Sequence, residues 1–312
     1  MRTRRLLFRA LMLRAAVHIH QSRYTEAEVS LARLVAMGPG QVGVYRHALA
    51  LGNLAIVHRE IGRVAQAESE YIEAAQVFGA MGRSDDEGRN LGNLANVLRD
   101  RGELETAEAE YQRALALVRA GRDPMSEGTI LGNHAECLLL LGRKAEAEQA
   151  ARDAAAVLDR IGDLCGLAQT LAISARIRAE QLDVIGAIEL CADAVERLER
   201  VESPILAAIA RAHLSRMLHQ AGQLKEALVQ SERSVQVLAA IGADETLHCL
   251  ALPVYICAAL AGTPDEVSRR SLLARLAECE AKLQELGFGP RSQSAQLIAE
   301  CNRRAYPTEV SP

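Results

Sequence analysis

The sequence is poor in aromatic residues, which make up 3% of its 312 residues, and it contains no tryptophan. A protein with one bulky core draws much of its buried area from such large side chains. The chain is nonetheless 49% hydrophobic, which excludes a disordered polymer. Because most of this apolar content is alanine and leucine, we expect thin layers of closely spaced helices.

Long apolar runs are also missing. No stretch reaches the ~18–20 residues that a membrane span needs, and the longest candidate, from Cys249 to Gly262, is interrupted by Pro253. The N-terminus reads MRTRRLLFRALMLR, so arginines break up the apolar core that a secretory signal requires. We predict no membrane partner and interpret this segment as a basic first helix.

The seven cysteines form neither a CxxC pair nor a Cys/His cluster. Their scatter over apolar positions indicates buried thiols in a reducing compartment, and we therefore predict a cytoplasmic protein. The net charge of -4 and the absence of tryptophan argue against nucleic acid as a partner, because nucleic-acid sites favour basic patches and stacking aromatics.

Catalytic motifs are absent as well. The chain has no GxxxxGK[ST] phosphate loop, no HExxH and no GxSxG. The pair His134 and Glu136 is two residues apart, so a helix would point the two side chains in different directions. We predict no catalytic residues, no metal and no cofactor, and hence a protein that is not an enzyme. A hydrolase or transferase stays open as an alternative.

What the sequence does contain is a repeat. The phrases LGNLAIVHREIGRVAQAE, LGNLANVLRDRGELETAE and LGNHAECLLLLGRKAEAE begin 40 residues apart. The same period gives seven copies, which start at Phe8, Ala48, Gly88, Gly128, Ala168, Ala208 and His248. Leucine prevails at the fourth position, a small residue at the eighth and alanine at the twentieth and twenty-seventh. This spacing predicts a pair of helices in each copy.

Glycine prevails at the fifteenth position, where it would supply the left-handed residue that ends the first helix of each pair. Leu182 occupies this column in the fifth copy. A leucine in that conformation costs about 1–2 kcal/mol. We therefore expect this one turn to take another path.

These columns, with Tyr71 and Tyr111 at position twenty-four, resemble the tetratricopeptide repeat, whose standard length is 34 residues. The phrase LGNLAN is similar to the Leu-Gly-Asn and kinesin-light-chain-like subgroup, and the arginine- and alanine-rich composition favours a bacterial origin. The resemblance covers about residues 8–287. It implies an all-α, right-handed solenoid of seven helix pairs, with one array over residues 1–290. Residues 291–312 would form a C-terminal capping helix and a frayed tail.

In such arrays the first helices line a concave groove, and the resemblance places ligand contacts at columns two, six, nine and thirteen. Column six holds Asn53, Asn93 and Asn133, and Asn96 follows one turn after Asn93. An amide both donates and accepts, so it can hold the backbone of an extended peptide. Asparagines of related scaffolds do so, and we expect it of these four. Alternatively, they are solvated or bond a neighbouring helix.

Basic residues occupy the same columns. Arg89, Arg176 and Arg216, together with His213, would pair with acidic side chains or a carboxylate terminus, although they equally suit a soluble surface. The sequence thus predicts a non-enzymatic protein-protein interaction scaffold with a protein or peptide partner. The alternative is a ligand-sensing array that controls a separate effector domain, as in bacterial regulators of this subgroup.

Overall fold

The computed structural model describes residues 2–21, 23–240, 255–256, 259, 265–285 and 298–299. Every regular element among them is a helix, which confirms the predicted all-α class. The predicted seventh first helix, from His248, and the capping helix after residue 291 fall largely outside the described residues. The helices are α1 (Arg2–His20), α2 (Tyr24–Ala36), α3 (Pro39–Val42), α4 (Val44–Glu60), α5 (Val64–Ala80), α6 (Ser84–Asp100), α7 (Leu104–Ala120), α8 (Pro124–Leu140), α9 (Lys144–Ile161), α10 (Leu164–Glu180), α11 (Val184–Arg200), α12 (Pro204–Gln220), α13 (Leu224–Ala240) and α15 (Glu266–Glu285).

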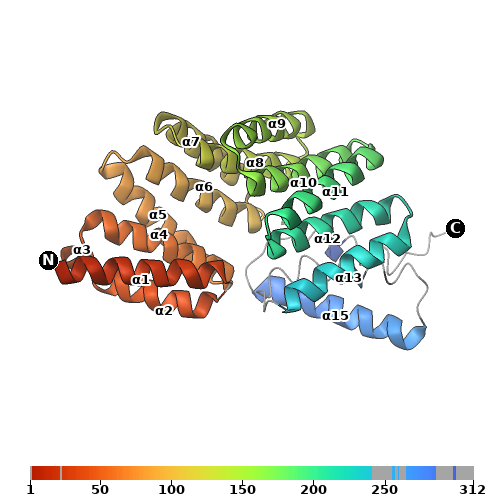
Figure 1. Cartoon of the computed structure of the whole chain (residues 1–312), viewed down its shortest axis with the longest axis horizontal. Coiled ribbons are helices and arrows are strands. Elements are labelled where there is room, and N and C mark those ends of the chain that lie inside the picture. Colours follow the sequence, from red (N-terminus) through yellow and green to blue (C-terminus); the bar gives the residue numbers. More distant parts are fainter. Residues whose placement is uncertain are drawn as a thin grey trace. The chain divides into compact units, whose positions relative to one another are not determined.

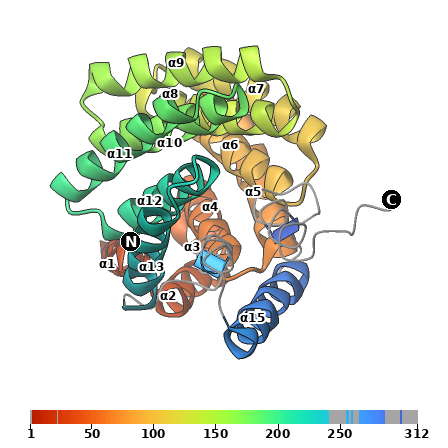
Figure 2. The same cartoon turned by 90° about the vertical axis from the view of Figure 1, so that its right-hand side faces the viewer.

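Helix packing divides the chain into two compact units. Unit 1 comprises Met1–Arg99 and Glu105–Ile130, and unit 2 comprises Asp100–Leu104 and Leu131–Pro312. Within each unit a helix packs on the next one in sequence, as α4 does on α5 and α10 on α11 (Figures 1 and 2). In unit 2, α10 also contacts α12, so first helices of successive copies lie side by side. The division into an array over residues 1–290 and a cap stays a prediction.

The turns between helices repeat every 20 residues, half of the sequence period. From α4 to α13, helices of 17 or 18 residues are joined by two or three residues. One residue of each turn has a positive φ, between 51° and 84°: Gly62, Gly82, Gly102, Arg122, Gly142, Gly162, Leu182, Glu202 and Gly222. A pair of backbone bonds closes such a turn, for example from Gly62 N–H to Arg59 O at 3.1 Å and from Arg63 N–H to His58 O at 2.7 Å.

The expectation for Leu182 is wrong, because its turn keeps the geometry of the others. Leu182 has a φ of 68°, and its N–H donates to Ala179 O at 3.1 Å. Asp183 then caps α11 by accepting the Gly186 N–H at 3.0 Å. The turn thus keeps backbone bonds at the end of α10 and a side-chain cap at the start of α11, which compensate for the cost of a left-handed leucine.

The glycine of the LGN phrase has a packing role. A Cβ atom on Gly52 of α4 would lie 2.5 Å from Asn90 Oδ1 of α6, and one on Gly92 of α6 would lie 2.8 Å from Ile130 Cγ1 of α8. Both distances are shorter than the contacts that Cβ atoms make in proteins. Glycine at this position therefore lets successive first helices of unit 1 approach closely.

Alanine has the matching role between the two helices of a pair. The eighth-column residues Ala55, Ala95, Ala135 and Ala175 are fully buried, as are the twentieth-column alanines from Ala27 to Ala227. Each buries little area but permits close helix contact. The low aromatic content is thus compatible with a continuous core, in which Tyr71 and Tyr111 are among the largest fully buried side chains.

Candidate functional site: a charged pocket on the first helices of unit 2

A pocket of about 190 Å³ opens in unit 2 on the first helices of three successive copies, α8, α10 and α12. Five of its eight lining residues stand in columns nine and thirteen, for which the sequence predicts ligand contacts. The pocket therefore lies on the surface that the repeat pattern indicates. Its lining consists of Leu139, Leu140, Arg176, Ala179, Glu180, Arg216, Met217 and Gln220.

A buried ion pair supports one wall of this pocket. Arg176 Nη1 of α10 donates to Glu136 Oε1 of α8. Arg176 is only 6% exposed and Glu136 only 9%. Burying two charges is costly unless they are paired, and the pair fixes the position of the guanidinium. Glu136 thus joins two successive first helices and orients Arg176.

His213 of α12 belongs to the same charged group. Its pKa is lowered to about 3, first by burial and then by the positive charge of Arg176, while Glu136 opposes the shift and Arg216 adds to it. At neutral pH the imidazole is therefore uncharged.

The structure thus brings together three of the predicted site residues, Arg176, His213 and Arg216. The sequence prediction did not include Glu136, although its position 40 residues before Arg176 in the same column was a usable signal. Asn133, also on α8, is half-buried, and the described residues offer its amide no hydrogen-bond partner.

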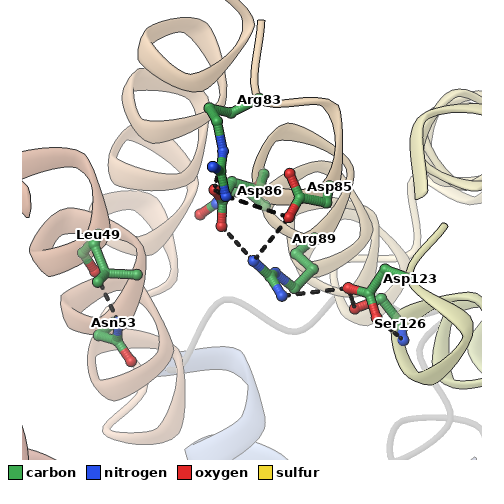
Figure 3. A network of polar contacts seen from close by, with 9 residues as sticks. Leu49, Asn53, Arg83, Asp85, Asp86, Arg89, Asp123 and Ser126 are labelled. Atoms are coloured by element: carbon green, nitrogen blue, oxygen red, sulfur yellow. Dashed lines mark hydrogen bonds and ion pairs between the residues drawn. The ribbon is translucent and has the colours of Figure 1, made fainter. Parts of the chain in front are cut away.

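In unit 1 the predicted asparagines differ from one another. Asn53 Nδ2 donates to Leu49 O of its own helix at 2.7 Å (Figure 3). Asn96 is 6% exposed and accepts the Tyr111 hydroxyl at 2.6 Å, so it fits the alternative in which the amide bonds a neighbouring helix. Asn93 is half-buried and, like Asn133, has no hydrogen-bond partner among the described residues.

Arg89 takes part in an intramolecular network at the starts of α6 and α8. Its guanidinium pairs with Asp86 and, at 3.2 Å, with Asp123, as Figure 3 shows. Asp86 is 2% exposed and also binds Arg83 at 2.9 Å. Asp123 in turn caps α8 by accepting the Ser126 N–H at 3.2 Å. An acidic ligand of Arg89 would therefore compete with carboxylates already in place.

Other chemistry that the sequence raised can be checked in the described residues. They contain no group of three or more His, Cys, Asp or Glu side chains placed to hold a metal ion. None of the four described cysteines forms a disulfide, and three of them are buried. Burial raises the pKa of Cys191 to about 12, which keeps that thiol protonated. No helix within the described part has the length and apolar character to cross a membrane.

Comparisons with known proteins agree with this architecture. The family model described as "Tetratricopeptide repeat" matches residues 46–120 and 86–160. No curated protein matches the sequence.

Three solved structures are similar in fold. A Rap protein complexed with Competence and Sporulation Factor has a TM-score of 0.65 at 16% identity, over 90% of this chain and 77% of that one. The Rap conjugation gene regulator of plasmid pLS20, in complex with the Phr* peptide, has a TM-score of 0.62 at 14% identity, over 87% and 77%. BtubC (BKLC) from P. vanneervenii has a TM-score of 0.53 at 19% identity, over 75% and 92%.

At these identities the structural likeness concerns the fold alone. The Leu-Gly-Asn subgroup and the bacterial origin stay predictions. The sequence match assigns tetratricopeptide repeats to residues 46–160, less than half of the chain, and the successive helix pairs of both units have the fold of such repeats.

Proposed function

We propose that this protein is a non-enzymatic tetratricopeptide-repeat scaffold that binds a peptide segment of a partner protein. In this proposal an acidic side chain of the peptide enters the pocket of unit 2. The observation that carries the proposal is the position of Arg176 and Arg216 in the lining of a pocket on the predicted contact columns.

The size of the pocket favours a side chain over a whole small molecule. Sites for drug-sized ligands enclose roughly 300–1,000 Å³, whereas this pocket measures about 190 Å³. A single side chain of a bound peptide fits such a volume. The rest of the peptide would then extend over the neighbouring surface of α8, α10 and α12.

The charges favour an acidic side chain. A guanidinium can form two parallel hydrogen bonds with a carboxylate, and such bonds are stronger than neutral ones. Arg176 and Arg216, which add to the effect of burial in lowering the pKa of His213, would also attract an anion. Because Glu136 already holds Arg176 in position, little conformational freedom is lost when the peptide binds.

Asn133 would complement this anchor. Its amide can donate to a peptide carbonyl and accept from a peptide N–H, whatever the peptide's side chains are. Asn93 offers the same groups on the first-helix surface of unit 1. The regulator of similar fold that was solved in complex with the Phr* peptide gives further support for a peptide ligand.

The anchor can be tested with peptides selected from a displayed random library. We expect them to be enriched in Asp and Glu. Arg216→Gln should weaken the binding of a selected peptide at least ~10-fold in fluorescence polarisation, since a charged hydrogen bond contributes about 1.5–3 kcal/mol. Arg200→Gln is the matched control, because this arginine of α11 is 72% exposed and lies outside the pocket. Selected peptides without acidic residues, or equal affinity for both variants, would contradict the proposal.

The amides need a separate test. We expect Asn133→Ala to weaken the same peptide by roughly 5-fold for each hydrogen bond lost. Asn53→Ala serves as the control, because Asn53 already donates within its own helix. Unchanged binding of Asn133→Ala would remove this asparagine from the proposed contact surface.

A second candidate is a regulatory array in which the bound peptide changes the affinity for an effector protein. One of the structures of similar fold is a conjugation gene regulator, and this favours the idea. Co-purification with and without the selected peptide, followed by mass spectrometry, separates the two functions. A partner that is gained or lost on peptide addition indicates regulation, and an unchanged set of partners indicates a simple scaffold.

A further inference from the structure

The connection between α2 and α4 departs from the regular turns. It runs from Met37 to Gly43 and contains the short helix α3, whereas later helices up to α13 are joined by two or three residues. Gly38 and Gly43 in this connection have φ values of 68° and 92°, with open space around both. Stacking of regular repeats does not require this longer segment, so its shape calls for another explanation.

The longer connection forms one side of a second pocket, which lies within unit 1 and measures about 550 Å³. This volume is in the usual range for small-molecule sites. Arginines of α1 and α4 form the other side. We call it the arginine pocket, and its lining consists of Arg4, Arg5, Pro39, Gly40, Gln41, Val42, Gly43 and Arg46.

The lining of the arginine pocket contains no carboxylate. None of Arg4, Arg5 and Arg46 forms an ion pair with a residue in the described part of the chain. By contrast, the two carboxylates of α2 are already engaged, as Glu26 pairs with Arg23 and Glu28 with Arg63. Residues 1–59 contain nine arginines and only these two acidic residues. The positive charge of the pocket is thus uncompensated by neighbouring residues.

Arg46 is also held in place. Its Nη1 donates to Val42 O at 3.3 Å, and its guanidinium carbon lies 5.7 Å from the centre of the Phe8 ring. A carbonyl and an aromatic ring therefore orient this cation without neutralising it. Like charges that face one pocket repel one another, and a bound anion relieves this repulsion.

We propose that the arginine pocket binds a small ligand with two or three linked phosphate groups. Three guanidinium groups offer enough paired donors for several phosphate oxygens, whereas a single carboxylate would leave most of the positive charge unmatched. The concave shape and limited volume favour such a ligand over the extended surface of a nucleic acid or a bilayer. This site is separate from the peptide pocket of unit 2, and either proposal can fail without the other.

The test is calorimetric titration of the full chain with inorganic pyrophosphate, inorganic tripolyphosphate and ADP at constant ionic strength. We expect the two inorganic anions to bind, and ADP to bind more tightly if the base also fits. Arg4→Gln/Arg5→Gln should weaken binding at least tenfold. Both side chains are exposed on α1, so the variant should keep its fold.

The matched control is Arg9→Gln/Arg33→Gln, which removes the same charge at exposed positions outside the pocket. It should change the affinity less than twofold. The absence of measurable heat, or an equal loss in both variants, would overturn the proposal. Binding to double-stranded DNA or to anionic lipid vesicles that pyrophosphate does not inhibit would also overturn the proposal. Arg46→Gln, with its melting curve recorded, provides a further variant from a second helix.

Discussion

The first helices of unit 1 and unit 2 carry polar side chains in the same columns but use them differently. In unit 1, Asn96 bonds the Tyr111 hydroxyl and Arg89 bridges aspartates at two helix starts. In unit 2, Arg176 and Arg216 line a pocket, and Glu136 orients the first of them. The column of a residue therefore sets the direction in which its side chain points. The groups opposite that side chain decide whether its role is structural or in binding.

The largest expected effect concerns the buried pair of unit 2. Glu136→Ala should lower the free energy of unfolding by about 3–5 kcal/mol, because it leaves the buried charge of Arg176 without this carboxylate. Glu26→Ala in unit 1 is the control, since Glu26 and its partner Arg23 are 38% and 53% exposed. The Glu26→Ala variant should lose at most ~1 kcal/mol of its free energy of unfolding. Urea unfolding measures the stability of both variants. Similar losses in the two variants would show that the buried pair contributes no more than the exposed one.

A smaller effect should separate Asn93 and Asn96, which lie one turn apart on α6. Asn96→Ala should cost about 1–3 kcal/mol, because the buried Tyr111 hydroxyl loses its acceptor. Asn93→Ala should change stability by less than ~0.5 kcal/mol, since no hydrogen bond is lost. A double-mutant cycle with Tyr111→Phe should return a coupling energy for Asn96 and none for Asn93. Equal effects of the two alanine variants would show that Asn96 is not structural.

A pH dependence should come from unit 2. The pKa of His213 is about 3 in the folded protein and about 6.5 when unfolded. Between these values the unfolded chain binds more protons, so stability falls as the pH falls below 6.5. The loss is at most ~1.4 kcal/mol per pH unit, or about 2 kcal/mol at pH 5. Melting at pH 7 and pH 5 measures it, and His213→Gln should show a smaller difference. Identical pH profiles would exclude His213 as the cause.

The smallest expected effect is a gain. Leu182→Gly removes the strain of a left-handed leucine but adds freedom to the unfolded chain, so it should stabilise the protein by up to ~1 kcal/mol. Gly142→Ala, at the same column of the preceding copy, should destabilise by a similar amount. Thermal melting of both variants gives the comparison. A lower melting temperature for Leu182→Gly would mean that its exposed side chain contributes contacts that outweigh the strain.

The sequence predicted most of the fold because each helix repeats the same local signals. Glycine in column fifteen and alanine in columns eight and twenty were sufficient to place the helix pairs, and Gly62, Gly142 and Gly222 have the predicted left-handed conformation. Leu182 was mispredicted because local propensity was weighed without the bonds that end α10 and begin α11. Those bonds compensate for a cost of about 1–2 kcal/mol.

The candidate site was predictable only in part. Columns six and nine brought Arg176, His213 and Arg216 onto one surface. The partners Tyr111 of Asn96 and Asp123 of Arg89 were not predictable, since Tyr111 lies on α7 and Asp123 precedes α8, and these contacts depend on side-chain geometry. The arginine pocket was missed for a different reason: it lies in the one connection from α2 to α13 that the 40-residue period does not describe.

The equal spacing of the turns has a consequence for how such a chain changes over generations. Every turn from Gly62 to Gly222 returns the backbone to the same conformation after 20 residues. A recombination that adds or deletes a whole 40-residue copy would rejoin the chain at a turn of the same geometry, with every helix at full length. Length can therefore vary in steps of one copy, while the side chains within each copy diverge independently.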